Sequence, residues 1–90
     1  MNLKEEIKQV ILILNEFGYA NDAIDRGYYN AGEEIRRKAY EDLKDFFSKC
    51  SLEMLELGGS ISKNNSLHGV GWSIELSKLE SILKNLDLEN

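Results

Sequence analysis

Apolar side chains return at the spacing of an α-helix along the first seventeen residues, and no other feature constrains the fold as strongly. The apolar positions are Leu3, Ile7, Val10, Ile11, Leu14 and Phe17. Asn2 followed by Glu5 has the spacing of a capping box, and Gly18 is a residue type that ends helices readily. We therefore predict a helix over residues 3–17. Because residues 10–14 (VILIL) are apolar all round, we expect them to lie centrally with neighbours on more than one side.

Two further helices are predicted in the middle of the chain. The first is a short helix over residues 22–29, capped by Asn21, in which Tyr28 turns inward. The second is the longest of all, over residues 31–49, and begins at a capping box opened by Asn30. Acid-before-base pairs four residues apart are expected on its solvated face. These pairs are Glu33 with Arg37, Glu34 with Lys38, and Asp45 with Lys49.

The last third of the chain contains a polar loop between two predicted helical segments. Ser51 caps a short turn of helix, and an amphipathic helix covers residues 72–87. Between them, residues 58–71 contain four Gly, three Ser and two Asn in 14 positions, which is typical of a loop with turns. The sequence thus predicts an all-α fold over residues 1–90: one small helical bundle of four to five helices with a Gly/Ser/Asn-rich loop before the last helix.

The composition is that of a small globular domain, and its net charge limits the classes of partner that the chain can bind. The chain is 42% hydrophobic and 30% charged, and its longest uninterrupted apolar run is far shorter than the roughly 20 residues that cross a bilayer. A single cysteine fits a reducing compartment, so we expect a cytoplasmic protein without a membrane anchor. The net charge of −5 disfavours nucleic acid and anionic lipid, which need a basic surface, and favours a basic protein partner.

The inventory of reactive side chains argues against catalysis. His68 is the only histidine and Cys50 the only cysteine, and a Cys/His pair is the one nucleophilic arrangement that the sequence leaves open. Zinc needs three or four such ligands. The carboxylates of residues 22–34 lack the spacing of a calcium loop. We therefore expect no enzyme activity, no metal and no cofactor.

A tyrosine-containing acidic segment is the favoured partner-binding surface. Tyrosine supplies rigid contact area, and neighbouring carboxylates pair with lysine or arginine of a basic partner. We predict that Asp22, Asp25, Tyr29 and Glu33 cluster around two helix starts and the turn between them. The acids can also serve the helix dipoles, which is the plain structural interpretation. The loop of residues 58–71 is the alternative binding surface.

Two motifs resemble a family of small bacterial immunity-like proteins that are encoded beside polymorphic or contact-dependent growth inhibition toxins. The first is LNEFG at residues 14–18, a helix that ends in an aromatic residue and glycine. The second is LGGSISKNNSL at residues 57–67, where a helix runs into Gly-Gly and a Ser/Asn loop before a closing helix. Here Ile61-Ser62 stands where the family has Gly-Ser, and an asparagine stands where it has aspartate. The resemblance implies an all-α inhibitor without catalysis that binds one cognate toxin domain.

Two functions of different classes follow. The leading hypothesis is a cytoplasmic immunity protein that neutralises a cognate, basic, nuclease-type toxin by stoichiometric binding. The alternative is a small regulatory or assembly adaptor of phage or plasmid origin, in which Trp72, Leu79 and Leu86 of the last helix cover a partner or a second copy. An enzyme is the least favoured class. Under either hypothesis the chain is a monomer or a weak homodimer.

Overall fold

The computed structural model describes residues 1–88 and contains four α-helices and one short 3₁₀-helix, with no strand in that part of the chain. The elements are α1 (Leu3–Asp25), α2 (Tyr29–Lys49), α3 (Leu52–Gly58), η1 (Gly59–Lys63) and α4 (Gly71–Leu88). The all-α prediction is confirmed. Side-chain caps form at two of the four predicted capping residues. Asn2 accepts a hydrogen bond from the Glu5 amide at 2.9 Å, and Ser51 accepts one from the Met54 amide at 3.1 Å.

The predicted end of the first helix at Gly18 is wrong, because α1 continues to Asp25. The chain turns at Gly27, whose φ of 91° is the left-handed conformation that glycine adopts without strain. Residues 22–25 therefore belong to α1, and the separate short helix over residues 22–29 does not form. Tyr28 occupies the N-cap position of α2 without a side-chain cap bond and is 65% exposed, so the predicted Asn30 cap and the inward Tyr28 are also wrong.

Gly18 has a packing role instead of a conformational one. The indole of Trp72, at the start of α4, lies directly over it: a Cβ at Gly18 would sit 2.6 Å from Trp72 Cη2. Gly32 on α2 allows a similar close approach farther up the hairpin, since a Cβ there would lie 2.8 Å from the carbonyl oxygen of Ala20. The missing side chains let α4 and α2 approach α1 closely from two sides.

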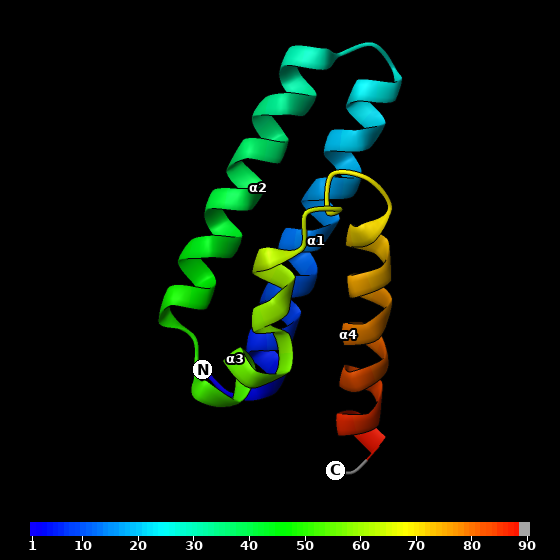
Figure 1. The fold of residues 1–90 in the computed structure, drawn as a ribbon. Helices are drawn as coiled ribbons and strands as arrows, with labels where there is room; N and C mark the ends of the chain where they lie inside the picture. Colours follow the sequence, from blue (N-terminus) through cyan, green and yellow to red (C-terminus); the bar gives the residue numbers. More distant parts are fainter. Residues whose placement is uncertain (89–90) are drawn as a thin grey trace.

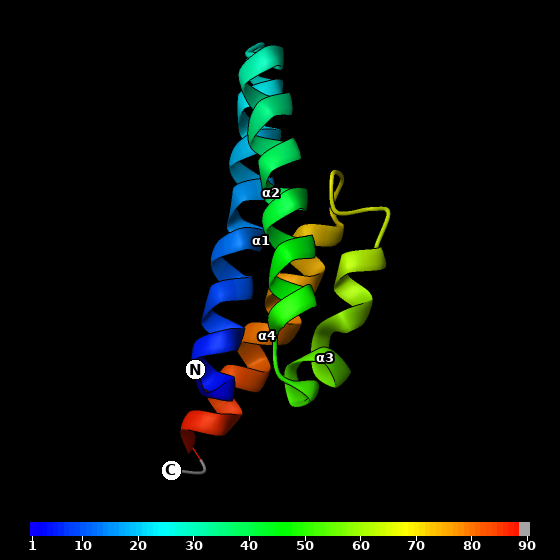
Figure 2. The same cartoon turned by 90° about the vertical axis from the view of Figure 1, so that its left-hand side faces the viewer.

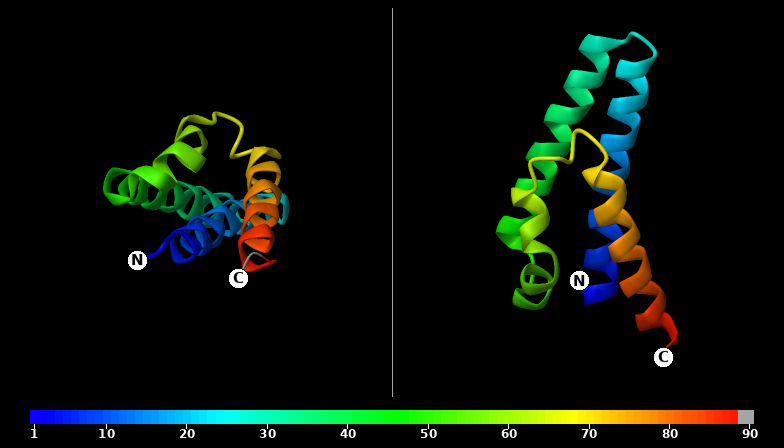
Figure 3. Two further views of the ribbon diagram at one scale, coloured as in Figure 1. Left: turned by 90° about the horizontal axis from the view of Figure 1, so that it is seen from below. Right: turned by 45° about the vertical axis from the view of Figure 1, so that its right-hand side comes forward.

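The helices form a long hairpin that is covered over only part of its length. α1 and α2 run antiparallel side by side, while α3, η1 and α4 pack against the half that contains the termini (Figures 1 and 3). The far end of the hairpin projects beyond the loop that precedes α4, which Figure 2 shows from the side. The molecule is accordingly elongated, with extents of 44 × 25 × 19 Å. We call the projecting end, residues 19–34, the hairpin tip.

The core lies in the covered half and draws on every element. Val10, Leu14 and Phe17 of α1 are fully buried, as are Leu43 of α2 and Met54 of α3. Residues 10–14 contact neighbours on two sides as expected, but Leu12 points to solvent and is 67% exposed, so the run is not enclosed all round. The polar segment of residues 58–71 also contributes to the core, because Ile61 and Leu67 are buried within it.

A buried carboxylate joins α1 to the start of α3. Glu6 accepts hydrogen bonds from the Ser51 amide at 2.9 Å and from the Ser51 hydroxyl at 2.7 Å. The same hydroxyl caps α3 through the Met54 amide, so one carboxylate orients the whole N-terminal turn of that helix. The two hydrogen bonds from Ser51 lower the pKa of Glu6 below its ordinary value.

The contact between Gly18 and Trp72 gives a first prediction. Gly18→Ala should destabilise the fold by about 1–3 kcal/mol, because the added methyl overpacks the indole even though alanine is the better helix former. In a Trp72→Leu background the same change should be neutral or stabilising, by up to about 1 kcal/mol. Urea titrations of the four proteins measure both values. Equal effects of Gly18→Ala in the two backgrounds would contradict the proposed contact.

The Glu6–Ser51 contact gives a second prediction, on pH. A carboxyl whose pKa is lowered by folding stabilises the native state above its unfolded pKa, near 4.5, and that stabilisation is lost as pH falls through the lower folded pKa. Wild-type protein should therefore exceed Glu6→Gln in thermal midpoint by a constant margin above about pH 6, and the margin should shrink as the solution is acidified below pH 4.5. Glu5→Gln, on the exposed neighbour, is the control. A margin independent of pH would refute the assignment.

Candidate partner-binding site

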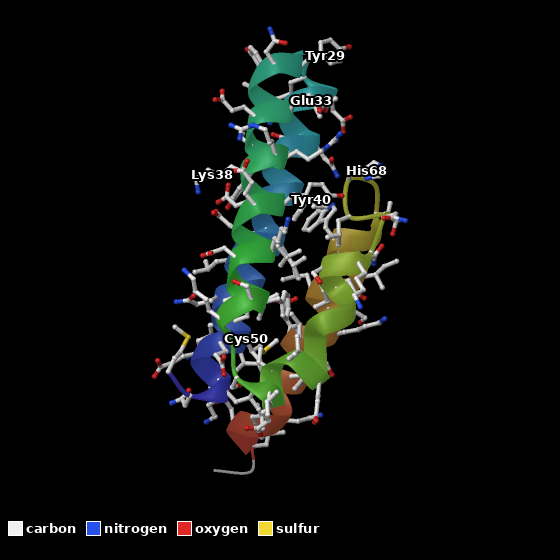
Figure 4. All side chains as sticks on the ribbon, turned by 60° about the vertical axis from the view of Figure 1, so that its left-hand side comes forward. Tyr29, Glu33, Lys38, Tyr40, Cys50 and His68 are labelled. Atoms are coloured by element: carbon white, nitrogen blue, oxygen red, sulfur yellow. The ribbon has the colours of Figure 1, made fainter. Side chains whose placement is uncertain are left out.

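The hairpin turn brings the four predicted residues to one end of the molecule. Asp22 and Asp25 lie in the last turn of α1, and Tyr29 and Glu33 in the first turns of α2. All four side chains are exposed, and Figure 4 shows Tyr29 and Glu33 at the end of the hairpin away from Cys50. They share the hairpin tip because Gly27 reverses the chain between the two pairs.

The prediction that the two aspartates lie at a helix start is wrong, because both lie at the C-terminal end of α1. A carboxylate in the last turn faces the negative end of the helix dipole, which costs about 0.3–1 kcal/mol at an exposed position. Asp22 is compensated by an ion pair with Arg26 at 3.1 Å, whereas Asp25 forms no ion pair or side-chain hydrogen bond with any residue that the structure describes. The plain structural role that the helix dipole offered to Asp25 is thereby removed.

Three tyrosines of the hairpin tip expose most of their side chains to solvent. Tyr19 is 63% exposed, and Tyr28 and Tyr29 are each 65% exposed. Tyr40, by contrast, packs edge-on against Phe17 with ring centroids 4.7 Å apart. The sequence analysis had placed Tyr28 inside. Recognising Gly27 as the turn would have placed it at the exposed start of α2.

The base of the tip is tied to the loop before α4 by a short hydrogen-bond chain. Arg36 donates to Glu33 at 2.9 Å and to the side-chain oxygen of Asn21 at 3.1 Å. The Asn21 amide in turn donates to the carbonyl oxygen of Gly69 at 3.0 Å. This chain joins α2, α1 and the loop at the level where the cover of the hairpin ends. The predicted pair of Glu33 with Arg37 is wrong: Glu33 pairs with Arg36, three residues on, and Arg37 pairs with Glu41.

The remaining ion pairs of α2 follow a different register from the predicted one. Arg37 pairs with Glu41 at 2.8 Å and Lys38 with Asp42 at 2.8 Å, and only the predicted pair of Asp45 with Lys49 is confirmed, at 3.2 Å. The Asp42 carboxylate raises the pKa of Lys38 through its hydrogen bond. All of these pairs are exposed, so each contributes little to stability.

His68 and Cys50 are not brought together. They lie at well-separated heights along the molecule in Figure 4, and the His68 ring is instead 3.4 Å from the Tyr40 hydroxyl. Burial, followed by the nearby Glu6 charge, raises the pKa of the Cys50 thiol, so its reactive thiolate is disfavoured at neutral pH. The Cys/His alternative therefore has no geometric support. Within residues 1–88, no three His, Cys, Asp or Glu side chains gather as metal ligands.

The function of the chain is inferred from its geometry, because comparison with known proteins found no match. No protein-family model, curated protein or solved structure matches the chain. As for membranes, none of the helices in the described part of the chain combines the length and apolar character that a bilayer span demands.

Proposed function

We propose that the chain is an immunity protein that neutralises a cognate toxin domain by binding it through the hairpin tip. The observation that carries the proposal is Asp25, a carboxylate that is exposed, has no ion pair among the described residues and occupies the unfavourable end of its helix dipole. A side chain that costs stability where it stands is a candidate for a role outside the fold.

The surroundings of Asp25 fit a basic protein partner. Tyr28 and Tyr29 are exposed on the same hairpin tip, and tyrosines that share a surface with carboxylates are frequent binding hot spots for lysine- and arginine-rich partners. The ion pair of Asp22 with Arg26 is solvent-exposed on both sides, so little free energy is lost when Asp22 exchanges partners, and the Glu33 carboxylate is itself exposed. A projecting tip also suits the concave surface of an enzyme, since a nuclease must leave room for its substrate. The resemblance at residues 57–67 supports the choice of toxin as the partner class.

Inhibition by binding alone requires no catalytic group, and we propose none. In the cytoplasm of the producing cell, an acidic inhibitor would associate quickly with a basic nuclease by electrostatic steering. For the alternative function, an adaptor acting through the last helix, two of the three side chains of the predicted surface pack within the chain. Leu79 is buried and Trp72 packs on Gly18, so these two side chains hold the chain together instead of facing a partner.

The proposal predicts that the hairpin tip governs affinity. Asp25→Lys combined with Tyr29→Ala should weaken binding to the purified toxin domain encoded beside this chain by at least about tenfold. Much of the loss should fall on the association rate, and it should shrink in high salt because the charges are exposed. Biolayer interferometry at two salt concentrations measures both effects.

The matched control is Glu56→Lys combined with Leu52→Ala on α3. It makes the same charge change and removes another exposed side chain at the opposite end of the molecule. Affinity should stay within about twofold of wild type for this control, since rim and remote residues contribute little. Equal losses in the two double variants would indicate a general charge effect. Loss confined to a variant of residues 58–71 would move the site to that loop.

A further inference from the structure

A groove between α2 and the α3–η1 segment carries positive charge in an otherwise acidic molecule. It has a volume of about 800 Å³, and Tyr40, Phe47 and Leu55 give it apolar surface. Lys44 stands on the α2 wall and Lys63 on the η1 wall, and no carboxylate lines the groove. Neither lysine forms an ion pair with a side chain that the structure describes. The groove thus offers two free cations beside an aromatic floor.

The chain itself carries the complementary chemistry on the same helix. At 3.6 residues per turn, Tyr29, Glu33, Arg37 and Lys44 fall along one side of α2. The acidic and aromatic residues lie toward its N-terminal end, and the lysine lies toward its C-terminal end beside the groove. A stripe that is acidic at one end and basic at the other complements its own antiparallel copy.

From this pattern we infer that two copies of the chain associate through antiparallel α2 helices, with Glu33 of each copy entering the Lys44–Lys63 groove of the other. The twofold axis then passes midway between Glu33 and Lys44. One helical turn farther on, Tyr29 of the second copy lies level with Ser48, beside Phe47 and the groove wall. Because the axis makes the interface isologous, each contact occurs twice.

On dimerisation Glu33 would give up one contact within its own chain, the ion pair with Arg36. The Glu33 carboxylate is 62% exposed, whereas the Arg36 side chain is 21% exposed and keeps its hydrogen bond to Asn21. The interface is a single helix pair with a small groove, which falls among the smallest specific interfaces, so we expect a reversible dimer at high concentration. The inference does not depend on the proposed toxin partner. Because Glu33 and Tyr29 belong to both surfaces, self-association and binding through the hairpin tip would compete.

Sedimentation equilibrium of the full chain, at concentrations up to about 1 mM and in low salt, tests the inference. Lys44→Glu should raise the dissociation constant by about tenfold or more, since two like-charge contacts replace two attractive ones. Glu33→Lys should weaken the dimer similarly, although it makes the chain less negative overall and would strengthen any association limited by net charge. The charge-swapped double variant, Glu33→Lys with Lys44→Glu, should restore the dimer toward the wild-type constant.

Lys84→Glu is the control, because Lys84 is an exposed lysine of α4 in a different groove, beside α1. It makes the same charge change as Lys44→Glu and should shift the constant by less than about twofold. A wild-type chain that stays monomeric up to ~1 mM overturns the inference and leaves the groove to another partner. So does a dimer that Lys44→Glu leaves intact, or one that the charge swap fails to restore.

Discussion

The packing of Trp72 on Gly18 decides which part of the molecule is core and which part projects. α4 begins at Gly71, so this contact fixes the point along α1, at Gly18, where α4 starts to cover it. From Gly18 toward the N-terminus, α1 is covered by α2 on one side and by α4 on another. The buried residues of α1 between Ile7 and Phe17 lie in this covered part. From Gly18 toward Asp25, α1 contacts α2 and, through Asn21, the loop before α4, and α1 and α2 then run on together to form the hairpin tip. The exposed tyrosines and acids occur in the part of the α1–α2 hairpin that α4 does not cover.

The helical elements were predictable because local patterns encode them, whereas the roles of the glycines were not. Hydrophobic spacing identified α2 and α4 to within two residues at each end, and the caps at Asn2 and Ser51 identified the starts of α1 and α3, whereas the end of α1 was misplaced by eight residues. Gly18 and Gly27 look alike in the sequence, yet one makes room for a side chain 54 positions later and the other adopts a positive φ. The residues around Gly18 give no sign of its contact with Trp72. The local sequence therefore predicts a helix end at Gly18, whereas the chain turns at Gly27.

The shared location of the four candidate residues was predictable from the sequence, but the place of the aspartates within their helix was not. Asp22, Asp25, Tyr29 and Glu33 do share one end of the molecule, although the aspartates end α1 instead of starting a helix. The loop of residues 58–71 shows the converse. Its composition predicted solvent-exposed turns, and the Ser66 amide does donate to Asn64 in such a turn, but Ile61 and Leu67 anchor the segment in the core. Two apolar residues among polar ones do not indicate burial in the local sequence. Whether they are buried depends on which part of the core the other helices leave open to solvent.

The central proposal, that the uncovered tip is the binding surface, is tested most directly by amide hydrogen exchange of the chain alone and in complex with the toxin domain proposed as its partner. Each backbone segment then reports its own protection. The account predicts slower exchange on binding within residues 19–34, with little change in the covered halves of α1 and α2 or in α4. Slower exchange confined to residues 58–71 or to α4, with an unchanged hairpin tip, would contradict it.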